Sequence, residues 1–253
     1  MSKLFAMDGC HAGWLVVSLD SDTDTCPRAC IVPTLEAFEA LLGPSDLVAI
    51  DMPVGLAEAE RENHARRLCD VQARKLLGRR ACCVFYAPAR GVLEHLAAPA
   101  TASSWHKLHT GKGLSCQVFH ILNKVKTLDA WLRRDDTRAR RVYEVHPELS
   151  FAYWAGSGKA PKPIQEGKKS SVGREERRRL IEAKWTGAIK AANDVLGPKS
   201  SAHPQPSLRW QEDDLLDALA ALWTLLRISN TRAVCLPDVP PKDAHGLSMC
   251  IWA

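Results

Sequence analysis

Short apolar runs alternate with polar turns through the first fifty residues of the chain. Each run has the length of a β-strand, and the first is apolar throughout, which is typical of a central strand. Thr34 is placed to cap a short helix over residues 35–42, which Gly43 and Pro44 end. A hairpin meander followed by this helical crossover sets the fourth strand parallel to the first. The predicted strands span residues 3–8, 14–19, 29–32 and 47–51.

Further along the chain, apolar residues recur mostly at helical spacing. The predicted helices span residues 58–77, 114–132, 174–193 and 212–229. Residues 141–145 predict a fifth strand, and residues 248–252 a last short one. Residues 79–135 form a helical insert between strands four and five, and residues 156–173 form a mobile basic loop rich in glycine and lysine. We therefore predict a single α/β domain over residues 1–253, with a five-stranded mixed central sheet flanked by helices.

Acidic residues stand where several of these elements begin or end. Asp8 ends the first strand and Asp51 the fourth, so a parallel pairing brings both to the same edge of the sheet. Asp214 and Asp217 are three residues apart and share one face of the last long helix. A carboxylate at the end of a buried strand is costly unless it has a partner. Converging carboxylates therefore indicate a site for a hard divalent cation such as Mg²⁺.

Each acidic position, taken alone, also has a simpler interpretation. A hairpin turn accounts for Asp8, and a turn before Pro53 accounts for Asp51. The helix dipole favours Asp214 and Asp217 at a helix start by about 0.3–1 kcal/mol each. What favours one common site is the order in which these acids occur along the chain. That order is strand–Asp, hairpin, strand–Asp, strand–Glu and helix–Asp-x-x-Asp.

Composition and charge add limits on the class of protein. The 253 residues are 46% hydrophobic and 25% charged, which is ordinary for a globular protein. The net charge of +5 permits a phosphate-bearing partner without requiring one. The nine cysteines are odd in number, no signal peptide precedes them, and no apolar run approaches a membrane span. We expect reduced cysteines, a cytoplasmic location and no membrane partner.

Several segments together carry a family resemblance. They are Asp8 to Trp14, Ala49 to Leu56, Arg61 with Cys69 and Asp70, Val84 to Pro88, Leu114 to Gln117, Glu144 to Phe151 and Asp214 to Ala220. On these segments the chain resembles the domain-of-unknown-function family numbered 429, described as predicted nucleases of the ribonuclease-H-like fold. The last segment is also similar to the final helix of bacterial Holliday-junction resolvases.

The resemblance implies a ribonuclease-H-like fold and a metal-dependent nuclease. Phosphodiester bonds would be hydrolysed by a two-metal, carboxylate-liganded mechanism that uses Mg²⁺ or Mn²⁺. Asp8, Asp51, Asp214 and Asp217 take the metal-ligand roles, and Glu144 is an additional catalytic candidate.

Other polar residues near these positions are candidates for supporting roles. His146 could move a proton or orient a ligand, and a structural hydrogen bond near Pro147 explains it equally well. The expected partner is a nucleic acid or another phosphoester. Lys168, Lys169 and Arg174 could approach its phosphate, or could simply belong to a solvated loop.

Two other classes of protein fit parts of the pattern. Sugar kinases and related ATPases share the strand–Asp–hairpin core, but they need two such halves and glycine-rich phosphate loops, and this chain has one half. A non-catalytic ribonuclease-H-like binding or scaffold protein is the alternative that keeps the fold. Buried carboxylates without a metal would repel one another, which counts against that alternative.

Overall fold

The computed structural model describes residues 2–20, 23–60, 65–197 and 210–253, and these divide between two compact units. The first unit comprises Met1–Met52, Arg141–Val234 and Trp252–Ala253. The second comprises Pro53–Arg140 and Cys235–Ile251, and the predicted helical insert at 79–135 falls inside it.

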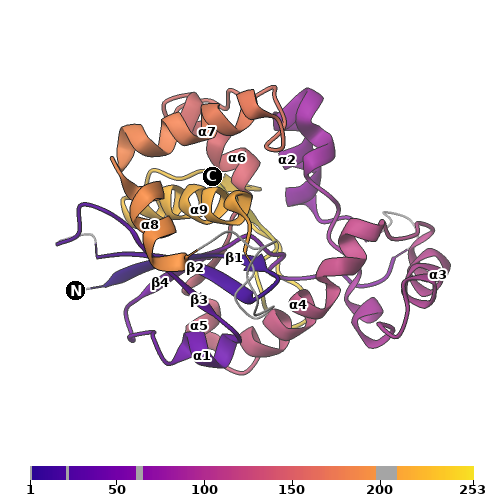
Figure 1. The fold of residues 1–253 in the computed structure, drawn as a ribbon. Helices are drawn as coiled ribbons and strands as arrows, with labels where there is room; N and C mark the ends of the chain where they lie inside the picture. Colours follow the sequence, from indigo (N-terminus) through magenta and orange to yellow (C-terminus); the bar gives the residue numbers. More distant parts are fainter. Residues whose placement is uncertain (1, 21–22, 61–64, 198–209) are drawn as a thin grey trace. The chain divides into compact units, whose positions relative to one another are not determined.

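The first unit is built on a mixed sheet of five strands in the order β3-β2-β1-β4-β5 (Figure 1). The strands are β1 (Lys3–Cys10), β2 (Gly13–Asp20), β3 (Arg28–Val32), β4 (Leu47–Ile50) and β5 (Val142–Glu144). β1, β2 and β3 form an antiparallel meander, while β4 is parallel to β1 and β5 is parallel to β4. The predicted five-stranded mixed sheet and the parallel pairing of the first and fourth strands are therefore confirmed.

The turn between β1 and β2 requires a glycine. Gly13 has φ +127°, and a Cβ there would lie 2.4 Å from the carbonyl oxygen of Val32. The third strand thus packs directly against the hairpin end, which no other residue type at this position would allow without strain.

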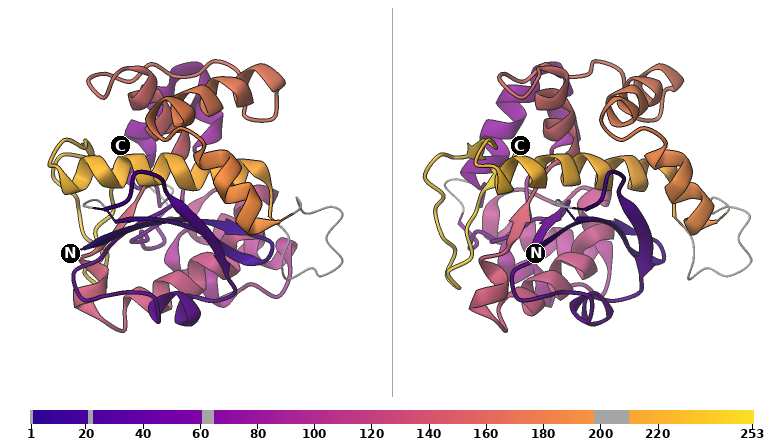
Figure 2. Two further views of the ribbon diagram at one scale, coloured as in Figure 1. Left: turned by 60° about the vertical axis from the view of Figure 1, so that its left-hand side comes forward. Right: turned by 90° about the vertical axis from the view of Figure 1, so that its left-hand side faces the viewer.

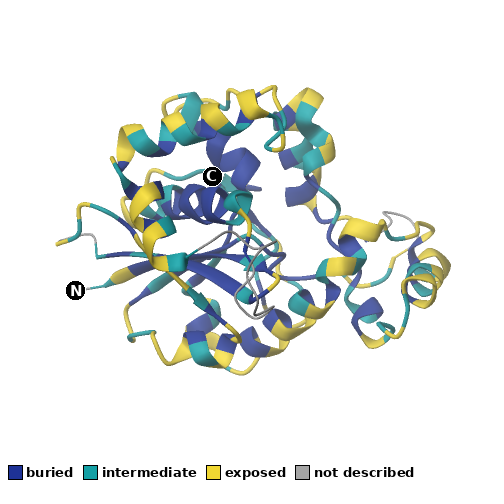
Figure 3. Ribbon diagram, in the orientation of Figure 1, coloured by how far each residue is buried: buried dark blue, intermediate teal, exposed yellow. Residues whose placement is uncertain are grey.

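Helices cover both faces of this sheet. On one face, α9 (Glu212–Ser229) lies across the strands and is almost wholly buried along its middle (Figures 2 and 3). α8 (Ala188–Leu196) packs on the same face at β3, while α6 (Pro147–Ala155) and α7 (Ser171–Lys184) pack against α9. On the other face, α1 (Leu35–Glu39) packs Phe38 edge-on against Phe5 of β1, with ring centroids 5.5 Å apart. The sheet is buried on both sides, which explains the continuous apolar run of β1.

Two predicted helices differ from the structure. The helix expected over 58–77 begins at Leu68, because Ala65 has φ +56° and Arg67 is extended with ψ 142°. Part of that prediction, residues 61–64, lies outside the described residues. The helix expected over 174–193 is two helices, because Gly187 adopts φ +80° and so breaks the helical conformation between α7 and α8.

The second unit is mainly helical. It contains α2 (Leu68–Leu77), η1 (Gly78–Cys83), η2 (Arg90–Glu94), α3 (Pro99–Thr110), α4 (Cys116–Leu132), α5 (Asp136–Ala139) and β6 (Cys235–Leu236), which pairs with β7 (Ile251–Trp252). The last predicted strand, 248–252, is thus only two residues long.

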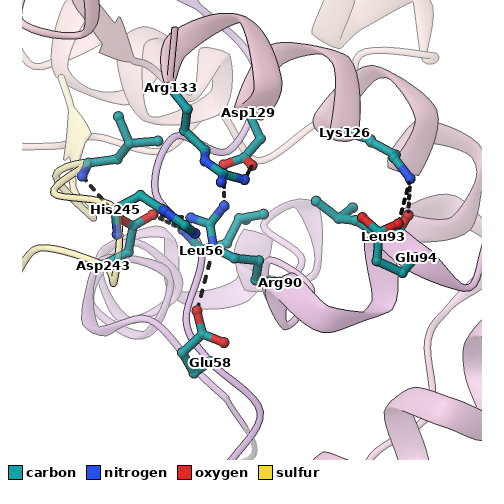
Figure 4. Close-up of polar contacts among 11 residues, drawn as sticks. Leu56, Glu58, Arg90, Leu93, Glu94, Lys126, Asp129, Arg133, Asp243 and His245 are labelled. Carbon is teal, nitrogen blue, oxygen red and sulfur yellow. Dashed lines mark hydrogen bonds and ion pairs between the residues drawn. The ribbon is translucent and has the colours of Figure 1, made fainter. Parts of the chain in front are cut away.

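Arg90 joins the two sequence segments of this second unit. Its guanidinium pairs with Asp129 of α4 and with Asp243, and lies 3.5 Å from Glu58 (Figure 4). The Asp243 side chain is fully buried and also accepts the amide hydrogen of Leu56 at 3.1 Å. Removing one member would leave a buried charge unpaired, so the network fixes the 235–251 segment on the helical body.

None of the helices in the described ranges is long and apolar enough to cross a membrane. None of the nine cysteines, all of which lie in the described ranges, forms a disulfide bond.

Candidate metal centre

Strand alternation places Asp8 and Asp51 on the α9 side of the sheet. Leu4 and Ala6 of β1 and Ala49 of β4 all belong to the apolar cluster packed against α9. Side chains two residues apart share one face of a strand, so Asp8 follows Ala6 and Asp51 follows Ala49 onto that face. The register pairs Met7 with Ile50, and the amide of Asp51 donates to the Met7 carbonyl at 3.1 Å. The two carboxylates therefore lie side by side where the parallel pairing of β1 with β4 ends, with Asp8 still inside β1 and Asp51 directly after β4.

Asp217 of α9 completes a cluster of three carboxylates. One ligand oxygen from each of Asp8, Asp51 and Asp217 lies within 4.8 Å of the other two. Asp8 and Asp217 are buried, whereas Asp51 keeps part of its surface in solvent. The predicted convergence of the first strand, the fourth strand and the last long helix is therefore confirmed for these three residues, which we call the carboxylate cluster.

The other three candidates take different positions. Asp214 accepts the amide hydrogen of Gln211 at 2.7 Å and completes a capping box at the start of α9. Glu144 is buried at the end of β5, and its charge is one of the smaller causes that raise the pKa of Asp51, after burial and Asp217. His146 is the N-cap residue of α6. Within the described residues, none of these three belongs to the carboxylate cluster.

Lys168 brings a positive charge to the carboxylate cluster. Its Nζ lies 2.6 Å from Asp217 Oδ2 and 3.5 Å from Asp213 Oδ2. Lys168 and Lys169 both belong to the predicted basic loop, but Lys168 is half-buried whereas Lys169 is exposed. The loop prediction placed a cation near the site without identifying which carboxylate it would contact.

The loop is held at this position by the start of α7. Residues 171–173, predicted as loop, are already helical, and Ser170 caps the helix by accepting the Gly173 amide hydrogen at 3.0 Å. Ser170 also donates to the carbonyl of Gly167 at 3.0 Å. A Cβ at Gly173 would lie 2.3 Å from that same carbonyl oxygen, so the close approach of loop and helix needs glycine.

The buried pair of Arg177 and Glu148 also holds the loop that carries Lys168. Arg177 is fully buried, and its Nη2 lies 2.8 Å from both carboxylate oxygens of Glu148 on α6. Its Nη1 donates to the carbonyls of Gly173 at 2.7 Å and Glu166 at 3.2 Å. Paired, hydrogen-bonded and buried, Arg177 ties α6, α7 and the loop carrying Lys168 into one rigid support.

The carboxylate cluster has strongly perturbed protonation equilibria. Burial, followed by repulsion from Asp51 and Asp217, raises the pKa of Asp8 well above its usual value. Burial and the charge of Asp217 do the same to the pKa of Asp51. Burial raises the pKa of Asp217 as well, although Lys168 offsets part of the effect. The neighbouring Asp214 has its pKa raised to about 6, mainly by burial.

Lys168 shows the reverse balance. Burial disfavours its ammonium form, but attraction from Asp217, Asp8 and Asp213 outweighs burial and raises the pKa of Lys168. One lysine thus faces three clustered carboxylates and leaves an excess of negative charge. That excess, carried by hard oxygen donors on three separate elements, suits a divalent cation such as Mg²⁺ or Mn²⁺.

Two supporting residues escaped prediction from the sequence. Arg177 stands four residues before Ile181 and eight before Trp185, on the inner stripe of α7. A charge on an apolar stripe is the signal that marks it. Glu148 follows Pro147 in the first turn of α6, where an acidic residue is ordinary, so only its pairing with Arg177 reveals its role.

The fold and the site define an α/β protein with a mixed five-stranded sheet and a three-carboxylate centre where the pairing of β1 with β4 ends. Over residues 7–242 the chain matches the model of the family described as "Protein of unknown function (DUF429)", and it belongs to that family. The membership of the family numbered 429 that the sequence led us to expect is therefore confirmed. Searches of curated proteins and of solved structures gave no match.

Proposed function

We propose that this protein is a metal-dependent nuclease of ribonuclease-H-like architecture that hydrolyses phosphodiester bonds. Asp8, Asp51 and Asp217 hold Mg²⁺ or Mn²⁺ through carboxylate oxygens. Asp214 supports them by closing the first turn of α9, so we assign it a positioning role rather than a ligand role. Glu144 and His146 remain candidates for proton transfer or orientation.

The observation that carries the proposal is the carboxylate cluster itself. Three acids from three elements meet within 4.8 Å, two of them buried, although their mutual repulsion destabilises the folded protein. A bound divalent cation would convert that repulsion into attraction. The antiparallel meander followed by two parallel strands, with acids on the first strand, the fourth strand and the last long helix, supports the ribonuclease-H-like assignment.

Phosphodiester hydrolysis is the reaction class that this donor set suits best. Bound to oxygen ligands, Mg²⁺ or Mn²⁺ supplies Lewis acidity to a phosphoryl oxygen and lowers the pKa of water. The protein's own residues fix the positions of the three donors through the β1–β4 register and the buried face of α9. Lys168 approaches from the side of the loop and is placed to contact an anionic substrate.

The test compares Asp8→Asn with Asp194→Asn, an exposed aspartate of α8 that undergoes the same charge change. Wild type and Asp194→Asn should bind Mn²⁺ by calorimetry and cleave labelled DNA, RNA or junction substrates only when metal is present. Asp8→Asn should lose cleavage by at least about a hundredfold, since losing one ligand disrupts the metal centre. Without metal, Asp8→Asn should melt at or above the wild-type temperature, because one of several like charges is removed.

Two results would contradict the proposal. One is unchanged Mn²⁺ affinity in Asp8→Asn. The other is clear destabilisation of the metal-free variant, which would mean that Asp8 has a structural role such as closing the hairpin.

A second candidate is a non-catalytic binding protein that keeps the fold. The observation in its favour is the short contact between Lys168 and Asp217, which gives the carboxylate cluster a counter-charge without metal. This candidate predicts that wild type shows no calorimetric heat with Mn²⁺ and no cleavage. Metal binding by the wild type that Asp8→Asn abolishes would exclude it.

A further inference from the structure

A cavity of about 480 Å³ lies in the second unit, lined by residues of α2, η1, α3 and α4 and of the segments between them. Its volume falls within the range of about 300–1,000 Å³ that is usual for small-molecule sites. It shares no residue with the carboxylate cluster.

The charges that line this cavity are all positive. Arg66, Arg74 and Lys112 contribute to the wall, and no carboxylate does. Among the described residues, no ion pair involves any of these three cations. Three cations that form no ion pair in the described part of the chain surround one concave surface, where they attract an anion and hold it with charge-assisted hydrogen bonds.

The remaining wall is aromatic and apolar. Phe85 and Tyr86 are both half-buried, and Leu114 and Val118 lie among the other lining residues. The Arg66 guanidinium lies 4.5 Å and that of Arg74 4.9 Å from the centroid of the Tyr86 ring. These cation–π contacts orient the two guanidiniums beside a flat surface. A ligand that combines an anionic group with a planar ring meets both features.

Buried polar residues hold the backbone of this wall in place. Asp70 accepts the amide hydrogen of Ala87 at 2.9 Å and is itself paired with Arg67 at 2.6 Å, with both side chains buried. His106 accepts the amide hydrogen of Ala89 at 3.2 Å through Nε2, and its Nδ1 donates to the carbonyl of Lys112 at 2.6 Å. The segment bearing Phe85 and the loop bearing Lys112 are therefore fixed before any ligand arrives, which lowers the cost of binding.

We propose that this pocket binds a nucleoside phosphate, taken either as a free mononucleotide or as one nucleotide of a single strand. The phosphate lies against Arg66 and Lys112, and the base lies along the aromatic wall. Gln117 and Ser115 supply hydrogen-bonding groups for the edge of the base.

The test uses the full chain with four probes: adenosine 5′-monophosphate, adenosine, inorganic phosphate and a short single-stranded oligoadenylate. Affinities are measured by calorimetry for wild type, Arg66→Gln and Arg79→Gln. Arg66 is exposed and its side chain contacts the Tyr86 ring, so Arg66→Gln should fold, whereas Arg74 also binds the carbonyls of Ala81 and Val84 and is left unchanged. Arg79 is exposed in the same unit and does not line the cavity, so it controls for charge alone.

We expect the monophosphate to bind at least about tenfold more tightly than adenosine or phosphate, and Arg66→Gln to lose about tenfold while Arg79→Gln loses nothing. A second readout is alkylation of Cys82, an exposed thiol on the cavity wall. The monophosphate should slow that alkylation without slowing alkylation of Cys30, which is exposed in the first unit.

The oligonucleotide distinguishes the two sources of the ligand. Tighter binding of the strand than of the monophosphate, with the same dependence on Arg66, assigns the pocket to a strand, and the reverse order assigns it to a free nucleotide. Equal affinity losses in Arg66→Gln and Arg79→Gln, or unchanged alkylation of Cys82 at saturating monophosphate and oligonucleotide, would overturn the proposal. Neither outcome depends on metal binding by the carboxylate cluster.

Discussion

Lys168 is the residue that most changes the electrostatics of the proposed metal centre. Its Nζ contacts Asp217 Oδ2 at 2.6 Å, and the surrounding carboxylates keep it charged by raising its pKa. A divalent cation that binds the same oxygen must therefore compete with an ammonium group already in place. The lysine stabilises the metal-free protein and at the same time weakens its affinity for metal.

Lys168→Met should accordingly raise the affinity for Mg²⁺ by about tenfold, since removing a neighbouring positive charge is worth on the order of 1 kcal/mol for partly exposed groups. The metal-free variant should melt at a lower temperature than wild type, because the carboxylate cluster loses its counter-charge. Calorimetric titration with Mg²⁺ and a thermal melt in chelator measure the two effects. Lys169→Met, which alters an exposed neighbour, should change neither quantity. Lower Mg²⁺ affinity in Lys168→Met would show that the lysine does not compete with the metal.

At the scale of elements, the support of the loop decides where Lys168 lies. Arg177 on α7 pairs with Glu148 on α6 and binds two backbone carbonyls at the loop and helix start. This buried pair is worth little net stability as a unit, but breaking it leaves one charge uncompensated.

Arg177→Met should therefore cost about 3–5 kcal/mol of the free energy of unfolding, because Glu148 would remain buried without its partner. The matched control is Arg179→Met, which removes an exposed pair with Glu175 and should cost no more than about 0.5 kcal/mol. Urea denaturation of both variants in metal-free buffer gives the comparison. Similar losses in the two variants would mean that the Arg177–Glu148 pair is not a specific support.

The same elements show what the sequence could and could not predict. The strand order, the start of α9 at Glu212 and the convergence of Asp8, Asp51 and Asp217 follow from local patterns and the handedness of crossovers. The break at Gly187 and the contact of Lys168 with Asp217 depend on residues distant in the sequence. Helical spacing indicates which face of a helix is apolar. It does not indicate which buried charged side chains form ion pairs with one another.

For the whole molecule, the raised carboxyl pKa values make stability depend on pH. Unfolded aspartates titrate near pH ~3.9, whereas the pKa of Asp214 is about 6 in the folded protein and those of Asp8 and Asp51 are well above the usual value. Between these limits the folded state binds more protons than the unfolded state. The stabilising contribution of these carboxyl groups to the free energy of unfolding is therefore fully present below their unfolded pKa. It is lost as the pH rises through their pKa values in the folded protein.

We expect the stability advantage of Asp8→Asn over wild type, measured without metal, to be near zero at pH ~4 and to grow towards neutral pH. Urea midpoints of both proteins at a series of pH values, in the presence of chelator, test this expectation. Saturating Mg²⁺ should reverse the order at neutral pH, because wild type alone retains the full ligand set. A difference between the two proteins that stays constant with pH would contradict the assigned repulsion.

The alternation of side chains along β1 has a consequence for how this protein tolerates genetic change. Asp8 shares its side of the strand with Leu4 and Ala6, so a slip of β1 by one residue against β2 and β4 would reverse the facing of every side chain in the strand. Such a slip removes the carboxylate from α9 and turns apolar side chains out of the core in the same event. Variants that keep the fold and lose the acids can therefore arise by substitution and not by a slip of β1. The register that buries the apolar side chains of β1 thus also fixes the position of Asp8. Lineages that lost the activity should therefore carry replaced aspartates in strands of unchanged length.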